Sequence, residues 1–173
     1  MSKTDSVVSN ASPLIHLAKA GNLSLLKDMF GEIMIPEEVF KEVCGAQDTP
    51  DSVVISDAVN DGWVRIIRLV SGDANLLAKS SGIDIGEAAT ILLAKKESAL
   101  LLIDDKMGRS AAEILGVRCL GTVGVLLQAL SDSMFKFDEF NAILDRMIDS
   151  GFRLDSKVYR LVLKIAKDLD ENR

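Results

Sequence analysis

The sequence predicts a three-layer α/β/α fold in which a central parallel sheet lies between two layers of helices. Short apolar segments of strand length alternate with helical segments up to about residue 130, which is typical of parallel sheets. Leu100-Leu101-Leu102-Ile103 is an unbroken apolar run bounded by charged residues, as expected for a strand buried on both faces. The chain of 173 residues is 48% hydrophobic, which is enough for one such domain with a substantial core.

Start and stop signals define the elements of the first part of the chain. The stretch that begins at Val7-Val8-Ser9-Asn10 is expected to form a short buried strand followed by a polar corner, and Asn10 follows the strand. Ser12 is the expected N-cap and Pro13 the first residue of a helix that runs to about Lys19. Apolar periodicity and glycine stops then predict a helix over 23–30, a strand over 33–35, a helix from Pro36 to about Val43, a helix starting near Asp48-Thr49-Pro50 and a strand over 64–67.

The second part continues the alternation and then becomes helical. The expected elements are a helix from Ser71 to about Gly82, a helix over 85–96 capped by Asp84, the strand 100–103, a helix over 106–115, a strand over 117–120 and a helix from Thr122 to about Leu130. Two amphipathic helices follow, over about 138–149 and 155–169. We therefore expect a domain over 1–130 and a C-terminal helical hairpin over 131–173 that packs on it.

Charge and composition exclude several classes of function. The net charge of −6 and the pI of about 4.8 argue against a broad nucleic-acid-binding surface, although clustered metal-binding carboxylates would also make a protein acidic. No apolar run approaches membrane-spanning length, and residues 1–5 lack the apolar core of a signal peptide. We expect a cytoplasmic protein without a membrane partner. Cys44 and Cys119 lie far apart in apolar contexts, which favours structural thiols over a zinc site.

Acidic and amide side chains occupy comparable places in this pattern. Asn10 follows the first strand, Glu42 lies late in its helix, Glu87 lies in the first turn of another helix, and Asp104 and Asp105 follow the strongest strand. Since ligands gather at the carboxyl edge of open parallel sheets, we expect these side chains to meet there. Oxygen ligands of this kind suit Mg²⁺ or Mn²⁺, and a cation would relieve the repulsion among the carboxylates.

Each of these residues also has a purely structural interpretation. Glu42 could be a solvated helix residue, and Glu87 could favour a helix N-terminus through the helix dipole. Asp104 and Asp105 could cap the following helix, and Asn10 could form an Asx turn. The shared placement of the residues at one sheet edge favours a common site over five separate structural roles.

Basic residues near this edge leave two interpretations open. Arg109, one turn after Asp105, could form an ion pair with Glu87 or an aspartate, or could contact a substrate phosphate. Lys106 is expected to be solvent-exposed, with a phosphate contact as the alternative. His16 is expected to be partly buried or at the surface rather than a ligand.

The last predicted helix combines an apolar stripe with a basic one. The basic stripe consists of Arg153, Lys157, Arg160, Lys164 and Lys167. The helix before it is acidic on its polar side, so the two helices could pack with complementary charge. Alternatively, the basic stripe could guide RNA or bind an acidic partner segment.

Four sequence motifs together resemble the PIN domain. They are Val8-Ser9-Asn10-Ala11-Ser12-Pro13-Leu14-Ile15, Ile35-Pro36 with Val39 and Glu42-Val43, Gly86-Glu87-Ala88-Ala89, and Leu102-Ile103-Asp104-Asp105 with Arg109 and Ala112. The chain is most similar to the uncharacterised prokaryotic branch of PIN-like proteins of the DUF3368 type. The resemblance covers residues 6–130, and the tail is similar in kind.

The resemblance implies a PIN-like fold and the activity of a Mg²⁺- or Mn²⁺-dependent ribonuclease, often the toxin of a toxin–antitoxin pair. By this resemblance Asn10 stands where the first metal-binding aspartate is expected, Glu42, Glu87 and Asp105 match the other acids, and Asp104 lies beside them. Ser12 matches a hydroxyl that orders the metal or its water. The implied partners are an RNA substrate, an antitoxin-like protein and a second copy of the chain in a homodimer.

Asn10 is the departure from the family pattern. An amide oxygen can ligate Mg²⁺, but it contributes no charge and cannot accept a proton from water. The missing charge could weaken metal binding by a few kcal/mol at an effective dielectric constant near 20. Two functions follow: an endoribonuclease, in which Asn10 assists Asp105, Glu87 and Glu42, or a catalytically weak or inactive PIN-like binding or assembly module. A nucleotide-binding fold is disfavoured because no glycine-rich loop follows Val8.

Overall fold

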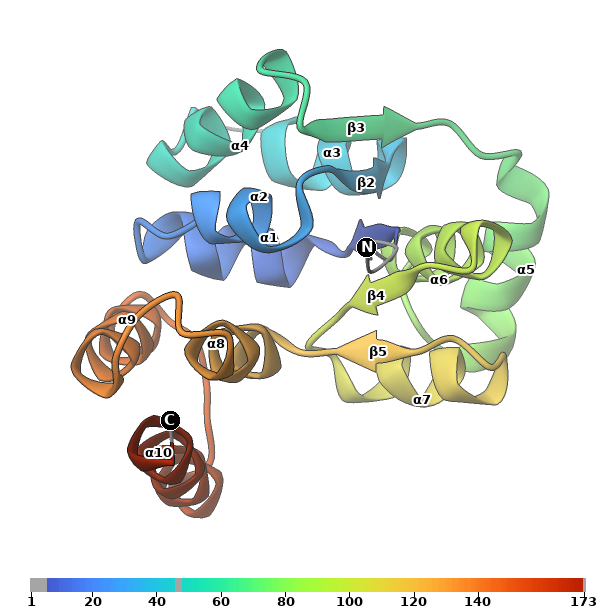
Figure 1. Ribbon diagram of the computed structural model, residues 1–173. Coiled ribbons are helices and arrows are strands. Elements are labelled where there is room, and N and C mark those ends of the chain that lie inside the picture. Colours follow the sequence, from blue (N-terminus) through green and yellow to red (C-terminus); the bar gives the residue numbers. More distant parts are fainter. Residues whose placement is uncertain (1–5, 46–47, 173) are drawn as a thin grey trace.

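The computed structural model describes residues 6–45 and 48–172; residues 1–5, which support the expected cytoplasmic location, lie outside the described residues. Five parallel strands form one sheet in the order β3-β2-β1-β4-β5, with β1 at its centre (Figure 1). The strands are β1 (Val7–Ser9), β2 (Ile33–Pro36), β3 (Val64–Ile67), β4 (Leu100–Leu102) and β5 (Cys119–Leu120). The predicted parallel sheet is confirmed.

Helices cover both faces of the sheet, which confirms the predicted three-layer α/β/α class. Alternate strand residues separate the two cores: Val7 and Leu102 pack on one side, and Val8 and Leu101 on the other. The first core is closed by α1 (Ala11–Lys19), α2 (Ser24–Phe30), α3 (Glu37–Cys44), α4 (Pro50–Asn60), α8 (Thr122–Ser131), α9 (Phe137–Asp149) and α10 (Ser156–Glu171). The second core is closed by α5 (Ser71–Ser81), α6 (Ile85–Glu97) and α7 (Lys106–Ile114).

Two predicted helix starts are wrong by one to two residues. The N-cap of α1 is Asn10, with an extended backbone (φ −77°, ψ 174°), and not Ser12. Pro13 is therefore the third helical residue, which is tolerated because first-turn N–H groups have no partner within the helix. Pro36 is the last residue of β2 and the N-cap of α3, so it does not open the helix as predicted. The predicted cap at Asp84 is confirmed.

The strand register aligns the carboxyl ends of the central strands. Ser9 of β1 lies beside Leu102 of β4, and Leu102 lies beside Leu120 of β5. The Asn10 N–H donates to the Leu102 carbonyl at 2.9 Å, which extends the ladder by one residue. The residues that follow these three strands therefore leave the sheet at one edge.

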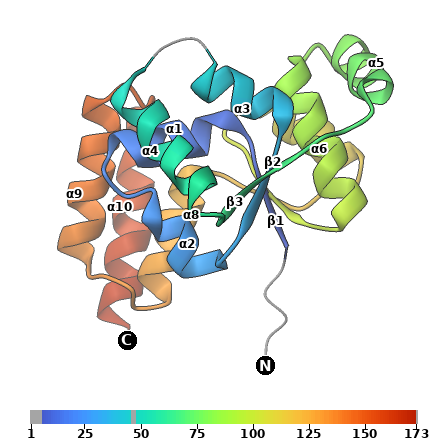
Figure 2. The ribbon, with the colours of Figure 1, turned by 90° about the horizontal axis from the view of Figure 1, so that it is seen from above.

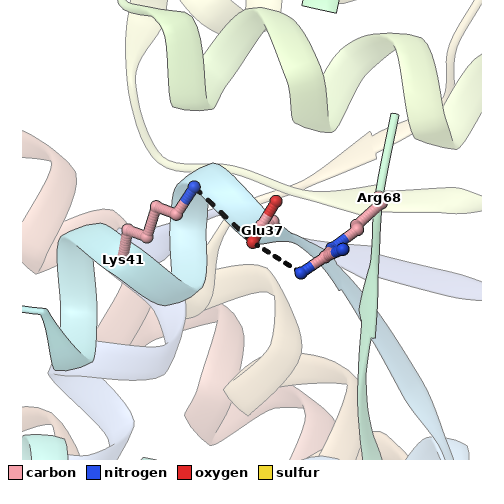
Figure 3. Close-up of polar contacts among 3 residues, drawn as sticks. All are labelled: Glu37, Lys41 and Arg68. Atoms are coloured by element: carbon pink, nitrogen blue, oxygen red, sulfur yellow. Dashed lines mark ion pairs between the residues drawn. The ribbon is translucent and has the colours of Figure 1, made fainter. Parts of the chain in front are cut away.

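An ion-pair cluster lies at the start of α3, close to the same edge. The Glu37 carboxylate lies 3.5 Å from the Lys41 ammonium and 3.4 Å from the Arg68 guanidinium, just beyond β3 (Figure 3). The Lys41 and Arg68 side chains are 68% and 83% exposed, so each pair contributes less than about 1 kcal/mol. The position of α3 is set mainly by buried Val39 and Val43.

The last two helices pack against the first core. Figure 2 shows α8, α9 and α10 on the side of the molecule opposite α5 and α6. Phe140 and Met147 of α9 are buried in the same core as Leu14 and Leu17 of α1. The Arg146 guanidinium donates to the Ala20 carbonyl at 3.0 Å. The division of the chain at residue 130 stays a prediction. None of the described helices has the length and hydropathy needed to cross a membrane.

The charge complementarity expected between the last two helices is limited in the described contacts. The Tyr159 hydroxyl of α10 donates to Asp145 of α9 at 3.3 Å. The ion pair of the basic stripe, between Lys167 and Glu171 at 3.7 Å, lies within α10 itself. Apolar packing, and not cross-helix ion pairing, therefore accounts for the association of these helices.

Candidate functional site

Four carboxylates gather at the carboxyl edge of the sheet, and we call them the acidic cluster. They are Glu42 of α3, Asp84 and Glu87 at the start of α6, and Asp105 at the start of α7. They meet because α6 packs against both α3 and α7. Gly86 permits this approach, since a Cβ atom there would lie 3.2 Å from Asp84 Oδ1 and 3.3 Å from Glu42 Oε2.

Two members of the acidic cluster also form the capping box of α6. Asp84 Oδ1 accepts a hydrogen bond from the Glu87 N–H at 2.7 Å, and Glu87 Oε2 accepts one from the Asp84 N–H at 3.3 Å. From the sequence alone, Asp84 is predicted as a helix cap and not as a member of the site. The i, i+3 spacing of Asp84 and Glu87 could have indicated that both belong to the cluster, because it places both carboxylates at the first turn of the same helix.

Burial and like charge disfavour ionisation of Glu87 and Glu42. The pKa of Glu87 is raised from its ordinary value of 4.5 to about 7, first by burial and then by the charges of Asp84, Asp105 and Glu42, while the hydrogen bond from the Asp84 backbone lowers it. The pKa of Glu42 is raised by burial and by Asp84. Protons or a cation would relieve this repulsion.

Asn10 lies beside the first turns of α6. Its side chain is buried, with 5% of the residue exposed. Asn10 Oδ1 lies 3.5 Å from the hydroxyl of Thr90, which donates more closely to the Gly86 carbonyl, at 2.5 Å. The structure therefore brings the amide of Asn10 to the helix that bears Glu87, with one long side-chain hydrogen bond among the described residues.

The adjacent residues Asp104 and Asp105 have different environments. Both oxygens of Asp104 accept from Thr122, one from its N–H at 2.7 Å and one from its hydroxyl at 2.6 Å. Thr122 is fully buried at the start of α8. Asp105 Oδ2 accepts from the Gly108 N–H at 2.8 Å, so Asp105 caps α7, as its structural interpretation predicted. Asp104 instead anchors α8 to β4, while the charge of Asp105 acts on Glu87.

The other predicted contact residues lie around this edge at separate points. Ser12 is half-buried in the first turn of α1. Lys106 is exposed at the start of α7 and borders a cavity between α5 and α7 whose lining includes no member of the acidic cluster. His16 is half-buried, as expected, and packs edge-on against Phe152, with ring centroids 4.9 Å apart; burial lowers its pKa.

The predicted ion pair of Arg109 with Glu87 or an aspartate is wrong for the described residues, among which Arg109 has no ion-pair partner. Its guanidinium points instead toward the turn between β5 and α8. A Cβ atom at Gly121 would lie 3.4 Å from Arg109 Nη1 and 3.2 Å from Asp104 Oδ1. The course of α7 aims this side chain away from α6, which periodicity along the chain could not indicate.

The chemistry of the acidic cluster fits a hard divalent cation. Its donors are all oxygens, which Mg²⁺ and Mn²⁺ prefer, and its members repel one another when ionised. Within the described residues, however, no three Asp, Glu, His or Cys side chains converge on a position where they could hold a metal ion together. The donor set therefore matches a cation in kind without being gathered around one point.

As the pH rises through 7, the metal-free wild type is expected to lose part of its free energy of unfolding. We expect Glu87→Gln to lose less, because glutamine does not ionise. A pKa raised from 4.5 to about 7 means that the contribution of Glu87 is fully present below pH 4.5 and is lost as the pH rises through 7. After allowance for solvent screening, this loss amounts to about 1 kcal/mol. Glutamine keeps an acceptor for the Asp84 N–H.

Urea unfolding in EDTA at pH 5 and pH 8 measures this effect. The wild type should lose about 1 kcal/mol more than Glu87→Gln between the two pH values. The control is Glu139→Gln, a change at an exposed residue of α9, which should behave as the wild type does. Equal losses in the wild type and Glu87→Gln would contradict the prediction.

The comparison with protein families agrees with the resemblance seen in the sequence. A family model described as PIN domain (DUF3368) matches residues 6–168. No curated protein matches the chain. PIN domains have a nuclease-type fold and generally use divalent metal ions, which agrees with the all-oxygen donor set at the sheet edge. Because the matching model spans nearly the whole chain, including α9 and most of α10, this protein belongs to the PIN-domain family.

Proposed function

We propose that this protein is a metal-dependent endoribonuclease whose centre is the acidic cluster. The observation that supports this most is that Glu42 of α3, Glu87 of α6 and Asp105, the cap of α7, lie around one edge of a PIN-type sheet, near enough for the charges of Glu42 and Asp105 to act on Glu87. Repulsion among neighbouring carboxylates raises the free energy of the ionised, metal-free cluster. A divalent cation bound between these carboxylates and a phosphate would offset the repulsion.

The residues have distinct proposed roles. Glu42, Glu87 and Asp105 would hold Mg²⁺ or Mn²⁺, and the amide oxygen of Asn10 would assist them. A bound divalent cation supplies a Lewis acid that activates water and offsets charge on the scissile phosphate. Asp84 fixes the first turn of α6, so that the backbone beneath Glu87 stays ordered.

Three further candidates act around this centre. Asp104 is assigned to positioning, because both of its oxygens are engaged by Thr122. Ser12 remains a candidate for ordering water at the site. Lys106, exposed directly after Asp105, remains a candidate phosphate contact.

The second candidate function is a catalytically weak or inactive PIN-like binding or assembly module. Asn10 favours it, since one expected carboxylate is replaced by an uncharged amide. A role as the toxin of a toxin–antitoxin pair in the cytoplasm, with an antitoxin-like partner and a homodimeric state, is proposed on the family resemblance alone. A small open reading frame beside the gene would support that role.

RNA cleavage with and without metal tests the proposal. We expect the wild type to cleave single-stranded RNA with Mn²⁺ or Mg²⁺ and to stop when EDTA is added. Calorimetric titration with Mn²⁺ provides the second measurement. Metal binding without cleavage would favour the binding module, and the absence of both would overturn the nuclease proposal.

A further inference from the structure

A cavity of about 320 Å³ lies at the turn from β5 into α8. It is lined by the start of α7, the turn from β5 into α8, the connection from α9 into α10, and the first turn of α10. Its polar wall includes Asp104, Arg109 and Arg153, and its apolar wall includes Val123, Leu154 and Val158. Asp104, which lines the cavity, directly precedes Asp105 of the acidic cluster, so their Cα atoms lie about 3.8 Å apart.

The two arginines of this cavity differ from most other arginines in the described chain. Arg65 and Arg68 form ion pairs with glutamates, and Arg146 and Arg160 donate to backbone carbonyls. By contrast, the described residues provide no side-chain hydrogen bond or ion pair for the guanidinium of Arg109 or of Arg153. Both residues are exposed, and in a protein with a net charge of −6 they place two guanidinium groups without a protein partner among the described residues on one cavity.

Asp104 forms no ion pair with either arginine among the described residues. Both of its oxygens accept short hydrogen bonds from Thr122, and its carboxylate makes no ion pair within 4.0 Å among the described residues. The cavity therefore presents two cationic groups with unused donors. A guanidinium group binds phosphate through paired N–H donors, with a geometry that suits a phosphodiester.

The apolar part of the cavity lining suits the remainder of a nucleotide. Leu154 is half-buried and Val158 is 43% exposed, so aliphatic surface faces the cavity next to the guanidinium groups. The volume lies within the range of small-molecule sites, about 300 to 1,000 Å³. An amphipathic ligand with a phosphate at one end and a flat apolar base at the other matches both walls.

We propose that this cavity binds one nucleotide of a single-stranded RNA, next to the phosphodiester at the acidic cluster. Arg109 and Arg153 hold its phosphate, and its base packs on Val123, Leu154 and Val158. The C-terminal hairpin thus contributes substrate-binding residues, and Arg153 belongs to them. The assignment of RNA rests on the proposed function, whereas the binding of a nucleotide in the cavity can be tested without cleavage.

The test measures binding of fluorescein-labelled hexauridylate by anisotropy in EDTA, where no metal-dependent cleavage occurs. We expect Arg153→Gln to weaken binding about 10-fold and to reduce the slope of log K against log salt by about 0.7, as for loss of one contact to a single strand. Val158→Asn should weaken binding without changing the slope. The control is Arg160→Gln, because Arg160 lies on the same helix outside the cavity and donates to the Ser156 carbonyl.

Unchanged binding by Arg153→Gln, or equal losses in Arg153→Gln and Arg160→Gln, would overturn the proposal. Preferential, Arg153-dependent binding of a glutamate-rich peptide would overturn it in favour of a protein partner. Binding of adenosine 5′-monophosphate as tight as that of the oligonucleotide would overturn it in favour of a free mononucleotide. If RNA binds through Arg153 but the wild type does not cleave it, this site stands and the proposed nuclease function fails. If the wild type cleaves RNA but Arg153→Gln binds RNA normally, the proposed nuclease function stands and the proposed nucleotide site fails.

Discussion

Asp105→Asn is expected to lower metal-dependent RNA cleavage at least about 100-fold, which corresponds to about 2.7 kcal/mol of transition-state stabilisation, without unfolding the protein. The change removes one negative charge from the acidic cluster. It leaves an amide oxygen that can still accept the Gly108 N–H, now bonded at 2.8 Å. The helix cap is therefore kept while the charged candidate ligand is lost. Initial rates at saturating Mn²⁺, with circular dichroism to verify folding, measure the effect.

The neighbouring residue supplies a matched control for this experiment. Asp104→Asn removes the same charge one position earlier. Its amide oxygen can still accept from the Thr122 N–H, and the Thr122 hydroxyl can reverse its role and accept from the new amide. We expect Asp104→Asn to keep cleavage within a few-fold of the wild type. Equal losses in the two variants would contradict the separate roles assigned to these aspartates.

Asn10→Asp is expected to tighten Mn²⁺ binding at least about 10-fold and to increase cleavage, while destabilising the metal-free protein by about 1 to 2 kcal/mol. The new carboxylate would lie in a site where 5% of the residue is exposed, beside a helix that already bears Glu87. Burial and like charge therefore oppose the change until a cation binds. Relative to the wild type, Asn10→Asp should therefore be less stable in EDTA and more stable in Mn²⁺.

Thermal unfolding in EDTA and in Mn²⁺, together with calorimetric titration, measures both effects. Asn60→Asp, which adds the same charge at an exposed position at the end of α4, is the control and should change neither Mn²⁺ affinity nor cleavage. If Asn10→Asp loses stability in EDTA without gaining Mn²⁺ affinity, Asn10 lies outside the metal site. In that case the binding-module function is favoured.

Much of the fold could be predicted from the sequence because each element is signalled locally. The apolar run at 100–103, the alternation of elements and the cap at Asp84 all act within a few residues of the chain. The starts of α1 and α3 could not be fixed in this way. Prolines are compatible with several positions around a helix start, so Pro13 and Pro36 did not locate the first helical residue.

The candidate site depends on side-chain directions that sequence spacing does not give. The positions of Glu42, Glu87 and Asp105 relative to the predicted strands and helices indicated a shared edge of the sheet. They could not indicate that the Asp104 side chain turns toward Thr122. The partner expected for Arg109 was wrong for the same reason. The place of Arg153 beside the cavity depends on how the C-terminal hairpin folds back on the domain, which no local signal specifies.

The packing of α9 on α1 has a consequence for the order in which the protein becomes complete during synthesis. A chain elongated just past residue 105 already contains all four members of the acidic cluster. It still lacks Phe140 and Met147, which share a core with Leu14 and Leu17. This core therefore closes only after α9 has emerged from the ribosome, well after the last member of the acidic cluster has been synthesised.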